Sequence, residues 1–424
     1  MNLYTIISVI ITLAILVSYF NYRFLKMQPA IAIMATSLCL SVVLLITDRL
    51  GFHIVHYDVT NFVNRLHFHD ILMNCMLGLL LFAGSLTVNI SLLKKQKWEI
   101  AVLSTVGVIA STFLVGFVIY FLLQLLHLKI SLIYCLLFGT LISPTDPIAV
   151  IATFKQSGAS KKMSILLVGE SLFNDGMAVV LFVILYHIAF AQESLTITHI
   201  TVLFFQRSLG GIAFGVILGM LTYWLMSPID DHKIAILFTI ALVTGGYTLA
   251  QAVNISGPLA MVAAGIFIAN NKNKIFRSKI MQEHLESFWE LIDELLNAIL
   301  FLLIGFEILL VHFSLWLILA AVLAIPLILL VRLLTIAIPM RFARYWRRYP
   351  PNTIKILTWG GLRGGLAVAL ALSIPEGAVS NILLPMTYIV VLFSILVQGS
   401  TIRLLIKKNK FAVISDIRDK ITSA

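Results

Sequence analysis

The sequence predicts an all-α protein that crosses a membrane many times. Of its 424 residues, 60% are hydrophobic and only 12% are charged, and the mean hydropathy is +1.02. Soluble domains carry about 25% charged residues, so a single soluble core could not hide this much apolar surface. The apolar residues fall in runs of about 17–25, the length that spans a bilayer as a helix. We therefore expect lipid to solvate most of the chain.

Thirteen runs have this character, and each is predicted to form a transmembrane helix. The segment 234–270 could also be divided as one bent pair. Between the runs, the stretch 271–289 mixes apolar and charged residues as an interfacial helix does. We expect residues 1–410 to form the membrane transporter domain and 411–424 a short cytoplasmic tail. The predicted spans are 3–20, 29–47, 71–93, 99–125, 130–154, 163–190, 202–226, 234–252, 255–270, 290–311, 314–338, 352–374 and 379–405.

The distribution of Lys and Arg predicts the orientation of the chain. Of the 30 such residues, all but six fall in loops that the thirteen spans place on one side of the membrane. Cytoplasmic loops carry the excess of Lys and Arg. We therefore expect an external N-terminus and a cytoplasmic C-terminus in a cell (inner) membrane. The charges sit at the ends of apolar runs rather than on one basic face, so the net charge of +11 does not indicate a nucleic-acid partner.

The segment Ser-Pro-Thr-Asp-Pro at 143–147 is predicted to interrupt one of these helices. Pro144 and Pro147 each remove a backbone donor and clash with the preceding turn. Carbonyl groups freed at membrane depth are tolerated only where they line a cavity, and interrupted helices build ion sites in many transporters. A kinked packing helix with a hydrogen-bonded Asp146 is the alternative. The ionisable Asp146 beside Thr145, between two prolines, favours an ion site.

The following run places further polar residues in the membrane, at 169–176. A charge at the bilayer centre costs roughly 2.5–3.5 kcal/mol, so it usually faces the protein interior and marks a pathway. Residues four apart share a helix face, so Glu170 lies over Asn174 and Ser171 lies over Asp175. A carboxylate and a hydroxyl on one face suit a hard cation such as Na⁺, and Asp146 could complete the site. Because a carboxylate holds either H⁺ or Na⁺, the two ions would compete.

Two arginines also lie within apolar runs. Arg363 is surrounded by four glycines, which permit close helix crossing and an irregular backbone. An arginine at this depth stays charged and needs a carboxylate, and we expect Glu170 to be the partner of Arg363. Arg332 could hold open the end of a half-helix, balance an ion site or serve the structure alone. Glu307, close to the end of its run, is predicted to lie at the interface.

Other classes of function fit the sequence less well. An intramembrane hydrolase needs a base beside Ser171, but no histidine lies at membrane depth near it. A cation channel would favour rings of acidic residues or carbonyls in a symmetric oligomer. No cofactor is implied. Four histidines crowd the second loop, where a solvated loop and a metal or pH-sensing site both stay open; they are His53, His56, His67 and His69.

Together these segments resemble the electroneutral monovalent cation:proton antiporters, the branch that contains NhaP-type exchangers of archaea and bacteria and the animal sodium/proton exchangers. The resemblance rests on four segments, which occur in the order that the family has them: 143–147, 169–175, 288–305 and 359–365. It implies two inverted repeats with interrupted crossing helices, interleaved dimerisation and core bundles, a homodimer and no enzymatic activity. It also implies exchange of Na⁺, Li⁺ or K⁺ for H⁺ by alternating access.

The resemblance assigns roles to individual residues. Asp175 would be the carboxylate central to transport, and Asp146, Thr145 and Ser171 would help to bind the ion. Glu170 and Asn174 would be held with Arg363 in a structural network. Asn174 before Asp175 is typical of the electroneutral branch and implies one Na⁺ against one H⁺.

One position departs from the family pattern. Many members carry a glutamate in the third helix, where this chain has Ala83. A missing carboxylate leaves K⁺/H⁺ antiport open as an alternative to Na⁺/H⁺ antiport.

Overall fold

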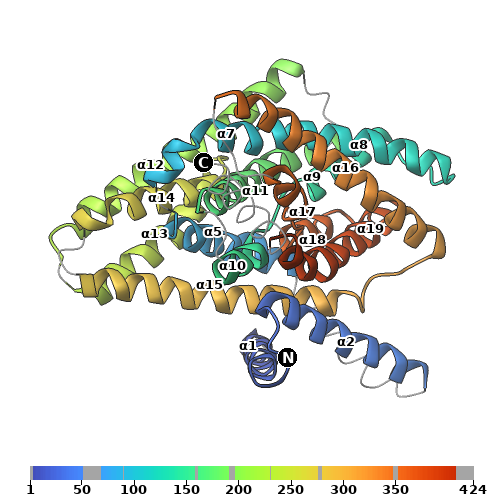
Figure 1. The fold of residues 1–424 in the computed structure, drawn as a ribbon, viewed down its shortest axis with the longest axis horizontal. Helices are drawn as coiled ribbons and strands as arrows, with labels where there is room; N and C mark the ends of the chain where they lie inside the picture. The colour runs from blue at the N-terminus through green and yellow to red at the C-terminus, as the bar shows by residue number, and fades with distance from the viewer. Residues whose placement is uncertain are drawn as a thin grey trace, which may run out of the picture.

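The computed structural model describes most of the chain as helix (Figure 1). The described residues are 3–50, 68–88, 90–157, 161–190, 196–229, 231–275, 279–346 and 352–406. The predicted tail at 411–424 and the loop histidines His53, His56 and His67 lie outside these ranges. Within them no strand is present, and the isolated β-bridge joins Asp146 to Leu362.

The helices follow the apolar runs. The N-terminal half contains α1 (Leu3–Phe20), η1 (Asn21–Leu25), α2 (Pro29–Arg49), α4 (Phe68–Ile71), η2 (Leu72–Met76), α5 (Leu77–Leu86), α6 (Ile90–Lys95), α7 (Lys97–Ser104), α8 (Val106–Leu125), α9 (Leu132–Ile142), α10 (Ile148–Ser157) and α11 (Lys161–Phe190). The C-terminal half contains α12 (Ile197–Met226), α13 (His232–Ala252), α14 (Gly257–Ile275), α15 (Lys279–Glu307), α16 (Leu315–Trp346), α17 (Thr353–Trp359), α18 (Gly365–Leu372), α19 (Ser380–Phe393) and η3 (Ser394–Gln398).

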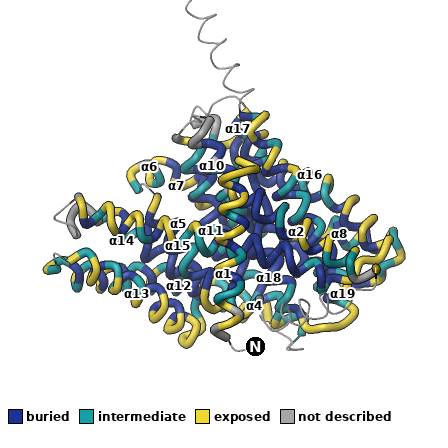
Figure 2. Tube along the Cα trace, turned by 90° about the horizontal axis from the view of Figure 1, so that it is seen from below, coloured by how far each residue is buried: buried dark blue, intermediate teal, exposed yellow. Residues whose placement is uncertain are grey.

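The prediction of a polytopic all-α protein is confirmed. Nine helices in the described part are long and apolar enough to cross a membrane. The other four predicted spans fall on α14, on α15 and on the pairs α9/α10 and α17/α18. Those two pairs are too short to count as single spans because each is broken in its middle. Large apolar side chains such as Phe121, Trp224 and Phe342 are exposed, as expected of surfaces that face lipid. Figure 2 shows that buried residues gather in the middle of the molecule and exposed residues along the outer helices.

The stretch 271–289, predicted to be interfacial, is divided between two long helices, and its position at the membrane surface stays a prediction. α14 continues to Ile275, and α15 runs unbroken from Lys279 to Glu307. Trp289 explains why the polar start of α15 joins the packed protein: it is 2% exposed, its ring packs edge-on against Phe82, and its Nε1–H donates to Thr239 Oγ1 at 3.0 Å. Leu285 and Phe288 pack in the same apolar cluster, whereas Ile280 is 65% exposed.

The two broken helices cross at the centre of the molecule. α9 ends at Ile142 and α10 begins at Ile148, and Pro144 and Pro147 account for the break between them. α17 ends at Trp359 and α18 begins at Gly365. The two extended segments meet antiparallel, with the Asp146 N–H donating to the Leu362 carbonyl at 2.7 Å. The expected interruption of crossing helices is thus observed, beside the long helix α11 (Figure 1).

Candidate functional site

The break in the first crossing helix is tied to α11 through Thr145. The Asn174 amide donates from Nδ2 to Thr145 Oγ1 at 2.7 Å, and the Thr145 N–H donates to Asn174 Oδ1 at 3.4 Å. The Ser171 hydroxyl donates to the Thr145 carbonyl and lies 3.1 Å from Thr145 Oγ1. All three side chains are buried. These bonds satisfy polar groups that the prolines leave without helical partners and fix the extended segment against α11.

Two carboxylates flank this cluster. Asp146 follows Thr145, and its Oδ1 accepts from the Ile148 N–H at 2.9 Å, which caps the start of α10. Asp175 follows Asn174 on α11 and lies close enough to Asp146 for their charges to repel. Both are partly exposed, and within the described chain no group donates a hydrogen bond to the Asp175 side chain. The pair therefore offers free oxygen atoms to a cation or a proton.

A glycine lets the second crossing segment approach this pair. A Cβ atom at Gly364 would lie 2.6 Å from Asp146 Oδ2. No larger residue fits there without displacing the carboxylate. Glycine at position 364 therefore allows the second crossing segment to pack directly against Asp146.

Arg363 stabilises the broken end of α9. Its Nη1 donates to the carbonyl oxygens of Ser143 at 2.6 Å and Pro144 at 3.0 Å. Its backbone N–H donates to Ser394 Oγ at 2.7 Å. A positive charge at a helix C-terminus compensates the partial negative charge of the last carbonyls. The carbonyls freed by the prolines are thus bound by an arginine rather than directed toward a cation.

The predicted partner of Glu170 was wrong. Arg332 forms the ion pair, with its Nη1 2.5 Å from Glu170 Oε1, and the two side chains are 9% and 1% exposed. Arg363 lies within electrostatic range of Glu170 but is engaged by the carbonyls of α9. Of the alternatives that the sequence left open for Arg332, a structural ion pair between α16 and α11 is the one observed.

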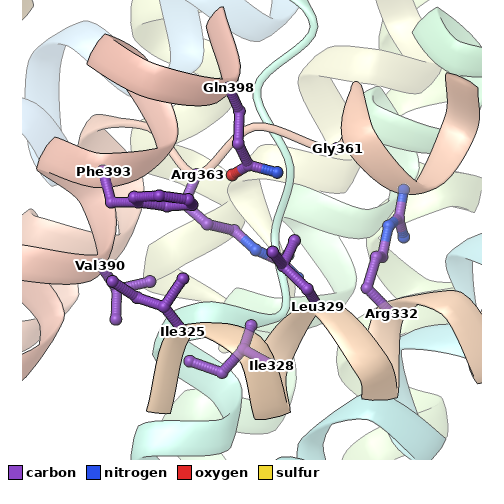
Figure 3. A pocket seen from close by; sticks show the side chains of 9 residues that line it. All are labelled: Ile325, Ile328, Leu329, Arg332, Gly361, Arg363, Val390, Phe393 and Gln398. Atoms are coloured by element: carbon purple, nitrogen blue, oxygen red, sulfur yellow. The ribbon is translucent and has the colours of Figure 1, made fainter. Parts of the chain in front are cut away.

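The guanidinium of Arg332 lies against a second glycine, Gly361, where a side chain would collide with it. Arg332 extends from α16 toward the loop that carries Gly361, beside a small cavity that Arg363 and Gln398 also line (Figure 3). A Cβ atom at Gly361 would lie 2.7 Å from Arg332 Nε. The second crossing segment, which carries Arg363, therefore also lies against Arg332.

Comparisons with known proteins decide the family. A family model described as "Sodium/hydrogen exchanger, transmembrane" matches residues 7–408. The Na(+)/H(+) antiporter NhaP of Pseudomonas aeruginosa is 44% identical over 408 residues, which cover 95% of this chain and 96% of that protein. The chain belongs to the sodium/hydrogen exchanger family. Membership confirms the predicted family and a multi-pass transporter rather than an enzyme.

Other family members extend this result to the fold. The Na(+)/H(+) antiporter NhaH of Halobacillus dabanensis is 35% identical and covers 80% of this chain and 83% of its own. The solved sodium proton antiporter MjNhaP1 of Methanocaldococcus jannaschii superposes with a TM-score of 0.73 at 18% identity, over 96% of this chain and 99% of that one. The exchanger fold is therefore shared along nearly the whole chain.

One acidic residue near the site escaped the sequence analysis. Asp293 on α15 lies within electrostatic range of Asp146. The sequence does offer a signal: Asn297 is a polar residue within the apolar run 290–311, and Asp293 lies one helical turn before it. Asp293 did not stand out because it lies in the first turn of the predicted span 290–311, between Glu290 and Glu294, where charged residues are expected.

The structure also shows the surroundings of Ala83 and His69, two positions that the sequence singled out. Ala83 on α5 is 3% exposed and packs in an apolar cluster with Phe82 and Trp289. The side chain that replaces the family glutamate is therefore part of the core. His69, of the loop histidines, lies on α4 and its Nδ1–H donates to the Ala369 carbonyl at 2.9 Å.

Proposed function

We propose that this exchanger transports Na⁺ in one direction and H⁺ in the other by alternating access. The observation that carries the proposal is the crossing of two interrupted helices, which brings Asp146 beside Asp175 in a chain of this family. Among the described residues neither carboxylate has an arginine of its own, since Arg332 is paired with Glu170 and Arg363 binds the carbonyls of α9. A cation and a proton can therefore compete for the same oxygen atoms.

The roles of the residues follow from their contacts. Asp175 carries the ion or the proton, and Asp146 and Ser171 are the further ligands of transported Na⁺. Thr145 shapes the site through its bonds to Ser171 and Asn174. Glu170, Asn174, Arg332 and Arg363 hold the crossing helices in place. Asn174 adds no second charge beside Asp175, which supports electroneutral exchange of one Na⁺ for one H⁺.

The wider arrangement is proposed with the same function. We infer a homodimer in the cell (inner) membrane with an external N-terminus, a cytoplasmic C-terminus, and dimerisation and core bundles interleaved along the chain. The excess of Lys and Arg on one side of the predicted spans supports the orientation.

The test is a pH-jump assay in vesicles that contain the purified protein. Addition of Na⁺, Li⁺ or K⁺ should discharge a preformed pH gradient, with Na⁺ expected to act at the lowest concentration. Because Ala83 removes a family carboxylate, a K⁺ response of equal affinity would favour the K⁺/H⁺ alternative. Clamping the membrane potential should leave the rate unchanged; a strong dependence on potential would contradict electroneutral exchange and favour a channel.

The Asp293→Asn variant tests the contribution of α15 to the site. Loss of a negative charge near Asp146 should weaken cation binding by on the order of 1 kcal/mol, which is about a fivefold rise in the half-saturating Na⁺ concentration. Glu283→Gln, an exposed carboxylate earlier on α15, is the matched control and should leave this concentration unchanged. Equal values for the two variants would show that Asp293 is not part of the site.

A further inference from the structure

A second polar cavity lies where several helices end on the predicted external side. It has a volume of about 650 Å³. Its wall is formed by α4 and η2, by α11 from Phe182 to Tyr186, by the end of α13, by the end of α15 and by the end of α18. Its polar lining includes His69, Asp70, Asn74, Gln251, Glu307 and Ser373. None of the described residues around it is Lys or Arg.

The inner wall of this cavity holds a buried carboxylate. Glu307, predicted to be interfacial, is 3% exposed, and its Oε2 has no hydrogen-bond partner in the described protein. It is the last residue of the 29-residue helix α15, where the helix dipole disfavours a negative charge. A buried carboxylate in such surroundings must take up a positive ligand or a proton.

The rim of the cavity is open and polar. Asp70, Asn74 and Gln251 are exposed, and the Gln251 amide donates to Asn74 Oδ1 at 3.4 Å. The Nδ1–H of His69 donates to the Ala369 carbonyl and is therefore not available to the carboxylate of Glu307. Tyr388, which lies within electrostatic range of Glu307, donates its hydroxyl proton to the Ile304 carbonyl at 2.5 Å. An ion entering from the rim therefore meets oxygen atoms of Asp70 and Asn74 before it reaches Glu307.

The cavity is separate from the central site. Phe182 lines it, and Val179 follows Asp175 by one turn on the same helix. Both side chains are buried in an apolar cluster that also contains Leu366 and Leu370 of α18. This cluster lies between the cavity and the carboxylates at the crossing.

We propose that the external cavity is a second binding site for a hydrated monovalent cation, with Glu307 as its carboxylate ligand and Asp70 at its mouth. The site holds the ion between the external solution and the central carboxylates. A hydrated ion suits the cavity, because no group of three or more acidic, His or Cys side chains among the described residues converges tightly enough to bind a bare metal ion. This inference rests on the proposed cation exchange.

The test compares Glu307→Gln with the unmodified protein in membrane vesicles of both orientations. In right-side-out vesicles, Na⁺ reaches the external face, and the half-saturating Na⁺ concentration should rise about fivefold because one charge is lost. In everted vesicles, Na⁺ reaches the cytoplasmic face, and the value should not change. Glu376→Gln, an exposed carboxylate in the loop after α18, is the matched control and should behave as the unmodified protein.

The outcomes separate the two proposals. If the unmodified protein exchanges Na⁺ for H⁺ but Glu307→Gln has the same external half-saturation, the second site is overturned. An equal rise on both faces, or a rise on the cytoplasmic face alone, also overturns it. Glu307→Asp keeps the negative charge and should have the external half-saturating Na⁺ concentration of the unmodified protein. A raised concentration in this variant would also overturn the second site. Absence of exchange in the unmodified protein would instead refute the proposed function.

Discussion

Replacement of Asp175 by Asn is expected to reduce cation-dependent proton movement to the background of empty vesicles. Asn has nearly the shape of Asp but neither carries a negative charge nor takes up a proton at neutral pH. No described group donates a hydrogen bond to the Asp175 side chain, so its charge is not required to hold a neighbour in place. The variant should therefore fold normally and fail in transport. The measurement is the pH-jump assay with Na⁺ on purified, reconstituted protein.

The control for this prediction is Asp231→Asn. Asp231 is exposed and caps the start of α13 by accepting from the Lys233 N–H at 2.8 Å. Asn caps a helix about as well as Asp, so both the fold and the transport rate should be preserved. Exchange by Asp175→Asn at more than about a tenth of the unmodified rate, a loss of about 1.4 kcal/mol or less in activation free energy, would remove Asp175 from the central role.

Replacement of Arg332 by Met is expected to destabilise the protein by about 3–5 kcal/mol, because it leaves the buried carboxylate of Glu170 without a partner. Glu170→Met should cost a similar amount for the converse reason. The pair is buried on both sides, and Arg332 bridges α16 to α11 with a 2.5 Å contact. Thermal unfolding of the purified variants in detergent measures the effect as a large fall in melting temperature.

The double replacement distinguishes an ion pair from ordinary packing. Glu170→Met combined with Arg332→Met removes both charges together, and a buried pair replaced by apolar residues is often neutral in stability. The double variant should therefore be more stable than either single variant. If the two losses simply add, the residues act independently and the ion pair is not the source of the effect.

Features that depend only on neighbouring residues along the chain could be predicted from the sequence. Pro144 and Pro147 break a helix because proline lacks the backbone donor, and the structure ends α9 and begins α10 around them. Lipid solvation likewise requires long apolar runs, so the helices could be assigned from hydropathy alone. The burial of Trp289 near the polar start of α15 could not be predicted in this way, because it depends on contacts with distant Phe82 and Thr239.

Hydropathy, prolines and isolated polar residues along the chain were enough to predict the membrane class, the break at 143–147 and the side chains that must face the protein interior. Which of these side chains meet depends on how the helices pack. Arg332 and Arg363 both had the charge to pair with Glu170, and the crossing of α17 and α18 over α9 assigned Arg363 to backbone carbonyls and Arg332 to the carboxylate. Asp293 and Glu307 gained their significance in the same way, from the helices packed around them. The physical reason is that a buried charge is satisfied by what lies near it in space, and the order of residues along the chain does not fix that neighbour.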